Sequence, residues 1–491
     1  MILNKLKQLT KDTAIYGIST IVGRFLSFLL VPFYTNIFHP AEYGIIANIY
    51  IFIGIFNIVY VYGMDAAYLK YAGLPSSGND KDNFSTPYLS VFIAGVIISI
   101  LMIMLRGEVF GLLDVPVNYY YLMFYSAGVL FLDSVTVIPF IQLRLQRKAK
   151  KFAAFKLINI GVNIVLNLVL ILKYKMGIEA VLISNLFASL SSLILLLPAI
   201  FRNLRIRFNK DLFKKLLKFG LPYLPAGLSS MLIQGIDRPI LGKLTSLDTV
   251  GIYNACYKLG IFMMLFVNMF QYAWQPFFLQ NAEEKNAKEI FSKVLTYFTL
   301  VSALILVILS LFIDNIVAIP IYHGRTLIDP AYWGGLSIVP IILFGYLFNG
   351  LYVIFTAGIY IEEKSIYIPL ITGIGAAVNI GVNFLLIPAW GIMGAALATL
   401  FAYLVMAAGL YIVTQKFYKI NYEIAKLTRI FFAILVVGGI YYYLLYSNQL
   451  ILVYKFLLFI FFTLFLYIFV FEKKEIDFLR TKLNILKQNR S

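Results

Sequence analysis

The chain has 491 residues, of which 61% are hydrophobic and only 13% are charged. This composition excludes a sizeable soluble domain, because too few polar residues are present to cover the surface of one. The 41 Lys and Arg residues outnumber the 23 Asp and Glu residues and give a formal net charge of +18, which in a soluble protein would suggest a nucleic-acid partner.

Apolar stretches long enough to cross a bilayer fill most of the chain, since a spanning helix needs about 20 mostly apolar residues. Fourteen such stretches predict an all-α polytopic membrane protein. In chain order the predicted spans cover residues 13–37, 42–64, 86–105, 118–142, 153–172, 177–200, 219–243, 249–274, 291–313, 332–358, 365–387, 391–415, 427–446 and 451–471.

Basic residues fall mainly into every second gap between these spans. If both termini are cytoplasmic, 31 of the 41 Lys and Arg residues lie on the cytoplasmic side, as expected because short cytoplasmic loops retain positive charge. Six count with the outer loops: Arg106, Lys173, Lys175, Lys243, Arg325 and Lys455. The net charge is therefore explained by basic loops that face anionic inner-leaflet lipids, and no nucleic-acid partner is predicted.

An internal repeat organises the chain. The five residues Asn159–Asn163 recur letter for letter as Asn379–Asn383, and each copy precedes a Gly-Ile pair that opens the next span. A second match, offset by 207 positions, aligns four residues of the first two spans with four of spans seven and eight: Pro32, Gly44, Ile45 and Tyr50 with Pro239, Gly251, Ile252 and Tyr257. Parallel repeats of this kind build transporters whose central site lies between two lobes.

The repeat predicts the domain organisation. A first six-helix lobe covers 1–200, a cytoplasmic linker 201–218, a second six-helix lobe 219–415 and an appended helix pair 416–471. The linker reads as an interfacial amphipathic helix, and the tail at 472–491 repeats that pattern. The linker's apolar stripe is Leu212, Phe213, Leu216 and Leu217, and the tail's is Ile476, Leu479, Leu483 and Leu486.

Charged residues inside spans are costly and are candidates for function. Arg24 lies near the middle of the first span, while Asp237, Arg238 and Lys258 lie in spans of the repeat-related second half. A group of cations with one carboxylate suits an anionic substrate such as a pyrophosphate, which arginine binds in a bidentate manner. Because neighbouring helical residues point about 100° apart, Asp237 and Arg238 are expected to pair elsewhere rather than with each other.

Other polar residues within spans carry weaker expectations. Asp133 is, with Asp237, a candidate for binding a coupling proton or cation, whereas Lys156 is expected to anchor its span at the cytoplasmic surface. The asparagines Asn159, Asn163, Asn379 and Asn383 either hold helices together or contact sugar, and membrane helices commonly use such residues for the former.

Enzyme, metal and cofactor signatures are missing from the sequence. It holds no Walker A motif, and the longest outer gap, around 314–331, is too short for the acidic loop expected of a membrane glycosyltransferase or polymerase. A single cysteine, Cys256, forms no internal disulfide, and His39 and His323 have no accompanying cluster of metal ligands. We therefore expect neither enzymatic activity nor a bound metal or cofactor.

Three stretches of the sequence carry a family resemblance. They are Gly23-Arg24-Phe25 through Val31-Pro32-Phe33-Tyr34 and Glu42-Tyr43-Gly44, then Gly235 to Gly242 with Val250 to Asn254, and finally Asn379 to Asn383 with Gly391 to Ala398. Together they resemble the polysaccharide transporter family of lipid-linked oligosaccharide flippases. The resemblance covers nearly the whole chain. It implies the multidrug/oligosaccharidyl-lipid/polysaccharide superfamily fold, with two six-helix lobes around a cationic cavity that opens alternately to either side.

The resemblance also implies a function. Members flip an undecaprenyl-pyrophosphate-linked glycan, such as an O-antigen repeat unit, across the bacterial inner membrane, driven by an H⁺ or Na⁺ gradient and in company with polysaccharide polymerase machinery. Arg24 matches the first-span arginine expected to meet the pyrophosphate. The alternatives are a lipid II flippase of peptidoglycan synthesis, a multidrug or cation antiporter of the same superfamily, and a non-transporting scaffold of a glycan-assembly complex.

Overall fold

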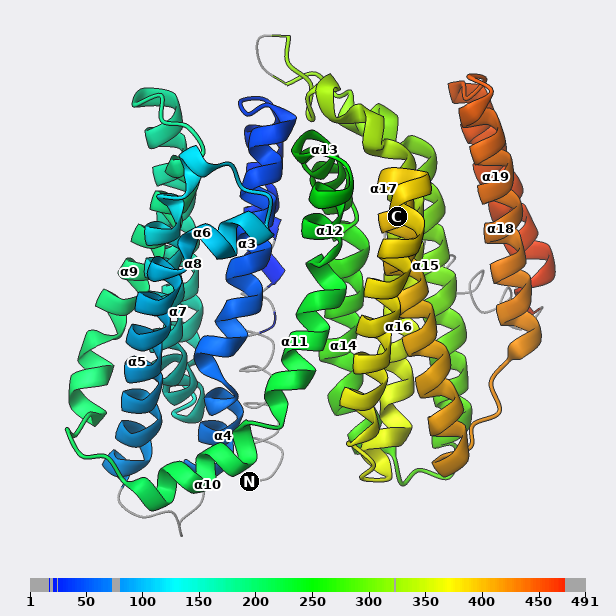
Figure 1. Ribbon diagram of the computed structural model, residues 1–491. Coiled ribbons are helices and arrows are strands. Elements are labelled where there is room, and N and C mark those ends of the chain that lie inside the picture. Colours follow the sequence, from blue (N-terminus) through cyan, green and yellow to red (C-terminus); the bar gives the residue numbers. More distant parts are fainter. Residues whose placement is uncertain (1–16, 18–20, 24, 73–79, 322–323, 473–491) are drawn as a thin grey trace, which may run out of the picture.

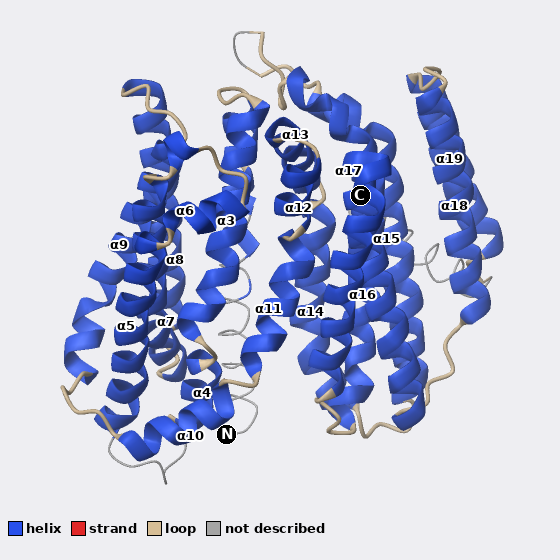
Figure 2. Cartoon of the chain, viewed as in Figure 1, coloured by secondary structure: helices blue, strands red, loops and turns tan. Residues whose placement is uncertain are grey.

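The computed structural model describes residues 17, 21–23, 25–72, 80–321 and 324–472. Within those ranges the fold is helical, and an isolated bridge between Pro320 and Thr326 is the sole β-type pairing. The helices stand side by side in two groups, with a further helix pair at one edge, as Figures 1 and 2 show. The prediction of an all-α polytopic membrane fold is confirmed.

The first group comes from the N-terminal part of the chain. Its elements are α2 (Leu30–Thr35), α3 (Pro40–Val61), α4 (Met64–Tyr71), α5 (Asp80–Met104), α6 (Arg106–Leu112), η1 (Val117–Tyr119), α7 (Leu122–Leu145), α8 (Ala149–Leu168), η2 (Val169–Lys173) and α9 (Glu179–Asn203).

Helix α10 (Lys210–Gly220) leads into the second group. This group contains α11 (Tyr223–Gly235), α12 (Asp237–Leu244), α13 (Leu247–Lys258), α14 (Ile261–Asn281), α15 (Ala287–Val317), η3 (Pro330–Ile338), α16 (Val339–Ile361) and α17 (Tyr367–Phe417). The edge pair is α18 (Ile424–Tyr446) and α19 (Leu452–Phe469).

The described part of the chain contains ten helices that are long and apolar enough to cross a membrane. The number rises to twelve when two bent pairs each count as one span: α10 with α11, bent by 43°, and α13 with α14, bent by 47°. The predicted first span, 13–37, lies partly outside the described residues. The count of fourteen therefore stays a prediction.

Helix α17 folds back on itself at Gly391. This residue has φ 51° and ψ −125°, a backbone conformation that essentially only glycine adopts without strain. Gly375 on the first leg lies against Met406 on the second, and the rings of Tyr367 and Phe417 at the two ends are 5.6 Å apart. The 51-residue element thus forms two antiparallel legs, at the place where the sequence separates two predicted spans.

Helix α10 has the amphipathic pattern predicted for the linker. Leu212 and Leu216 are buried in a cluster with Tyr68, Phe84 and Ile200 at one end of the first group, so these two residues of the stripe pack on protein. The lysines at 214, 215 and 218 are exposed on the opposite face. Figure 1 shows α10 lying across that end of the group. The predicted amphipathic tail lies outside the described residues except for its first residue, 472.

The edge pair is attached to α15 by a buried cation. Lys455 on α19, counted above with the outer loops, is only 2% exposed, and its ammonium contacts the side chains of Asp314 and Asn315 at 2.5 and 2.7 Å. Near the other end of the pair, Arg429 donates to the backbone oxygen of Phe469. The sequence placed Lys455 with the outer residues, and the structure adds that its side chain is buried in an ion pair.

Candidate functional site

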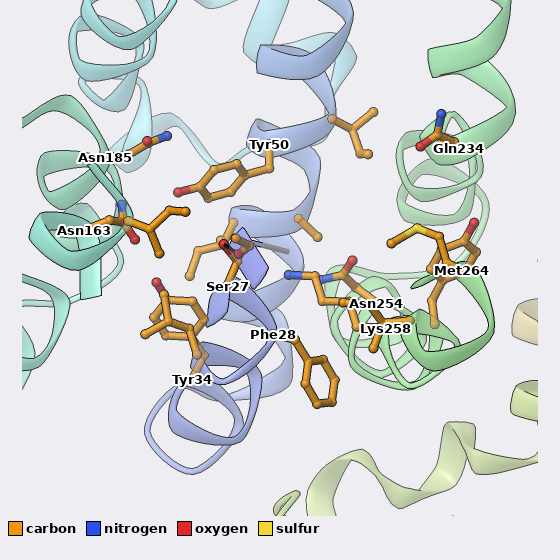
Figure 3. Close-up of a pocket in the computed structure, with 18 of the residues that line it drawn as sticks. Ser27, Phe28, Tyr34, Tyr50, Asn163, Asn185, Gln234, Asn254, Lys258 and Met264 are labelled. Atoms are coloured by element: carbon orange, nitrogen blue, oxygen red, sulfur yellow. Dashed lines mark hydrogen bonds between the residues drawn. The ribbon is translucent and has the colours of Figure 1, made fainter. Parts of the chain in front are cut away.

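A cavity of about 710 Å³ lies between the two groups of helices. Figure 3 shows side chains from both groups pointing into it, among them Tyr50, Asn163 and Asn185 from the first group and Asn254 and Lys258 from the second. Its polar and charged lining residues are Ser27, Tyr34, Tyr50, Lys156, Asn159, Asn163, Asn185, Gln234, Arg238, Asn254, Tyr257, Lys258 and Tyr346.

The internal repeat explains how two helices, one from each group, line the cavity. Helix α3 presents residues 47, 50 and 51 to the cavity, and helix α13 presents residues 254, 257 and 258. Each set has i, i+3, i+4 spacing, which places its members on one helical face. Each position in the first set lies 207 residues before its counterpart in the second, so the two walls are repeat-related. The two sets differ in chemistry at the third position, where Ile51 in the first half corresponds to Lys258 in the second.

Lys258 is the cation on this wall that has no carboxylate partner among the described residues. Its side chain is exposed to the cavity, and its ammonium lies 5.5 Å from the centre of the Tyr43 ring. An ammonium in a partly apolar cavity attracts anions more strongly than it would in bulk water, because solvent screening is weaker there. Lys258 thus places an ammonium group in the cavity that no described carboxylate neutralises.

Arg238 and Asp237 form an ion pair with each other, so the expectation that they pair elsewhere is wrong. Arg238 Nη1 lies 2.7 Å from Asp237 Oδ1, and the two residues are 3% and 0% exposed. The prediction used helical angles alone. A long arginine side chain can fold back to its neighbour, and leaving either buried charge unpaired would cost far more than bending the side chain.

Two tyrosine side chains surround this ion pair. Tyr253 donates to the second oxygen of Asp237, and the Arg238 guanidinium lies 4.0 Å from the ring centre of Tyr257. Arg238 also donates to the backbone oxygen of Gln234 at 2.7 Å. Although Arg238 lines the cavity, its charge is largely neutralised by Asp237, which leaves Lys258 as the stronger anion-binding group of the two.

The first group contributes a second charged site around Asp133. Ser189 donates to Asp133 Oδ1 at 2.6 Å, and the charge of Lys156 acts on the same carboxylate. Lys156 lines the cavity, with its ammonium 4.3 Å from the Phe140 ring. The spacing of Lys156, Asn159 and Asn163, which places all three on one face of α8, could have indicated this position. The expected role of Lys156 as an anchor at the cytoplasmic surface stays a prediction.

The asparagines divide between packing and cavity roles. Asn159 donates to the backbone oxygen of Ala188 at 2.7 Å and to Ser192 at 3.0 Å, which holds α8 to α9, and it also lines the cavity. Asn163 lines the cavity and accepts from Asn167. Both residues are therefore placed where they can contact a ligand.

Asn379 and Asn383 lie away from the cavity lining and are fully buried. Asn383 donates to the backbone and side-chain oxygens of Asn379 at 2.8 and 3.1 Å. Asn167 bonds to Asn163 in the same way. The same bond between two asparagines one helical turn apart therefore occurs in both halves of the molecule.

Two predicted residues cannot be placed. Arg24 and His323 lie outside the described residues. The described neighbours Gly23 and Ser27 line the cavity. Among the described residues, no group of His, Cys, Asp and Glu is arranged to hold a metal ion.

Comparison with solved structures defines the class of protein. A lipid II flippase, MurJ, in an inward closed conformation matches with a TM-score of 0.72 and 16% identity, over 92% of this chain and 98% of that one. An inward-facing multidrug resistance transporter of the MATE family, in the MOP superfamily, matches with a TM-score of 0.67 and 13% identity, over 80% and 94% of the two chains. The fold is therefore like that of these two transport proteins.

The chain belongs to the polysaccharide biosynthesis protein family, whose model matches residues 35–322, more than half of its length. The resemblance to polysaccharide transporters seen in the sequence is thereby confirmed. A relative with 23% identity over 447 residues is an uncharacterized membrane protein, MJ1068, of Methanocaldococcus jannaschii, and the match covers 81% of this chain and 83% of the relative.

Proposed function

We propose that this flippase moves an undecaprenyl-pyrophosphate-linked oligosaccharide, such as an O-antigen repeat unit, from the inner to the outer leaflet of a bacterial cytoplasmic membrane. The carrying observation is that the ammonium of Lys258, which has no carboxylate partner among the described residues, lies in a cavity whose other wall bears amide side chains and Lys156. Cations together with several neutral hydrogen-bonding groups match a ligand with an anionic part and a hydroxyl-rich part. Transport by alternating access, rather than chemical conversion, is the proposed activity.

The chemistry of the two walls gives the proposed orientation of the substrate. The pyrophosphate would lie at Lys258, because phosphate oxygens accept charge-assisted hydrogen bonds from an ammonium group. The sugars would lie toward Asn159, Asn163 and Asn185, whose amides can both donate to and accept from hydroxyl groups. The isoprenoid tail would stay in the surrounding bilayer.

The proposed function is tested by removing the gene from its host. We expect a surface glycan to disappear and its lipid-linked precursor to accumulate on the cytoplasmic side, with both effects reversed by a plasmid copy. Arrest of peptidoglycan synthesis and lysis would instead indicate a lipid II flippase. Changed resistance to cationic drugs with normal surface glycan would indicate a multidrug exporter.

We also propose that both termini and α10 face the cytoplasm, because this orientation leaves most basic residues inside. A cysteine replacing Asn448, in the turn between α18 and α19, should react with an impermeant thiol reagent in intact cells after Cys256→Ser removes the native cysteine. A cysteine at Asn209, the N-cap of α10, should not react. The opposite pattern would reverse the orientation.

Ion coupling is proposed for Asp133 rather than Asp237. The Asp237 carboxylate is neutralised by Arg238, whereas Asp133 has a hydroxyl donor and a lysine charge that could be displaced when a cation or proton binds. Asp133→Asn should leave substrate movement intact but remove its response to an imposed H⁺ or Na⁺ gradient, measured in proteoliposomes. Ser191→Ala, on the same helix as Ser189, is the matched control. An unchanged gradient response would remove Asp133 as the coupling residue.

A further inference from the structure

Two glycines bring α3 and α13 into backbone contact at the end of the cavity away from α10. A Cβ atom added to Gly44 would lie 2.1 Å from the backbone oxygen of Leu247, and one added to Gly251 would lie 1.9 Å from the backbone oxygen of Pro40. Both obstacles are main-chain atoms, so no flexible side chain can move aside. At this point only glycine allows the two helices to be as close as they are.

The contact is symmetric between the halves of the protein. Gly44 and Gly251 are 207 residues apart, and so are Pro40 and Leu247, which is the offset of the internal repeat. Each helix therefore contributes the same glycine and the same carbonyl group, and the axis that relates the two halves runs through the crossing.

The crossing forms one end of the cavity. The next turn of each helix, at Ala47 and Asn254, is already part of the cavity lining, and Tyr50 and Lys258 follow one turn further. When the two helices are in contact, the path from this end into the cavity runs through main-chain atoms. Under the proposed orientation this is the outer face of the membrane.

Other contacts between the two halves gather around the same point. The Tyr332 hydroxyl, from η3 of the second group, donates to the backbone oxygen of Phe38 at 2.8 Å, and the ring of Tyr332 packs edge-on against Tyr43 at 5.9 Å. Asn36 donates to the backbone oxygen of Thr326 at 3.0 Å. These contacts add to the packing of α3 against α13 and hold the crossing closed.

We propose that the Gly44–Gly251 crossing is the outer gate of the transporter, closed in this structure, and that the two helices part here to open the cavity to the outer side. A methyl group at either glycine would require the helices to separate by on the order of 1 Å, because packed backbones cannot overlap. It would destabilise the closed gate and leave the open gate unaffected. This inference rests on the proposed alternating access but not on the identity of the substrate.

The test is access to the cavity from outside. In a Cys256→Ser background, Ser27→Cys places a reporter thiol on the cavity wall, where the side chain is exposed. Gly44→Ala and Gly251→Ala should each raise the rate at which an impermeant thiol reagent labels this cysteine in intact cells, by roughly 10-fold, as expected from the cost of overpacking one methyl group. The matched control is Gly438→Ala, since a Cβ there meets no atom within 4 Å.

A separate variant covers the case in which an alanine at the crossing prevents accumulation of the protein. Tyr332→Phe removes the hydrogen bond to Phe38 across the gate and should raise outside labelling a few-fold, in line with the loss of one neutral hydrogen bond. Unchanged labelling in the variants that accumulate, or an equal rise in Gly438→Ala, would overturn the proposal. Because labelling needs no substrate, its outcome is independent of whether the transported molecule is a lipid-linked glycan.

Discussion

Replacing Lys258 by alanine should reduce export of the lipid-linked oligosaccharide by roughly 10- to 100-fold, because each hydrogen bond to a charged group contributes about 1.5 to 3 kcal/mol. The protein should accumulate normally, since no described carboxylate depends on this ammonium and its removal lessens the cost of placing charge in the membrane. Lys258→Arg should retain part of the activity because the positive charge remains. Surface glycan measured at matched protein abundance tests the prediction.

The control for this experiment is Lys243→Ala, which removes an exposed lysine on the neighbouring helix α12. Its glycan export should stay within the range of the unaltered protein. Full export by Lys258→Ala at normal abundance would eliminate Lys258 as the pyrophosphate-binding residue. Loss of export together with loss of the protein would show that Lys258 has a structural role instead.

Replacing Arg238 by alanine should lower the stability of the folded protein. The change leaves the fully buried Asp237 carboxylate without its partner, and breaking a buried ion pair in this way costs about 3 to 5 kcal/mol. We expect a marked fall in the thermal unfolding temperature in detergent and reduced abundance in membranes. The double change Asp237→Asn with Arg238→Gln should recover much of the loss, because neither buried charge then remains.

Equal destabilisation by the double and single changes would contradict this account of the ion pair. So would an Arg238→Ala protein that is as stable as the unaltered one but has lost export, since Arg238 would then act chiefly on substrate. The contrast with Lys258→Ala, where export falls and stability does not, separates the two cavity cations by their different surroundings.

Much of the architecture could be predicted from sequence because membrane spans are set by local composition. A long apolar run predicts a helix wherever it occurs. The break at Gly391 could be predicted because a Gly-Ile pair opens the next span there. The amphipathic spacing of the linker likewise predicted α10. What the apolar stripe of α10 packs against was not predictable, since lipid and the end of a helix bundle select the same residue pattern.

The site was predictable in its residue types but not in its pairings. Charged residues within spans correctly marked Lys258 and Arg238 as cavity residues. The pairing of Arg238 with its own neighbour was not expected from helical angles. The position of Lys156 in the cavity lining depends on how helices from distant parts of the chain pack. The asparagine repeat shows the same limit, because Asn159 and Asn163 line the cavity whereas Asn379 and Asn383 are buried away from it.

The central claim, that this protein flips a pyrophosphate-linked glycan lipid, is tested most directly with purified protein in proteoliposomes. A fluorescent polyprenyl-pyrophosphate oligosaccharide is placed in both leaflets, and a membrane-impermeant quencher reports the fraction that becomes accessible from outside. We predict protein-dependent translocation that is strongly reduced by Lys258→Ala and is absent for the same lipid with its pyrophosphate replaced by a neutral linker. Equal translocation of the charged and neutral lipids, or none by the unaltered protein, would contradict the account.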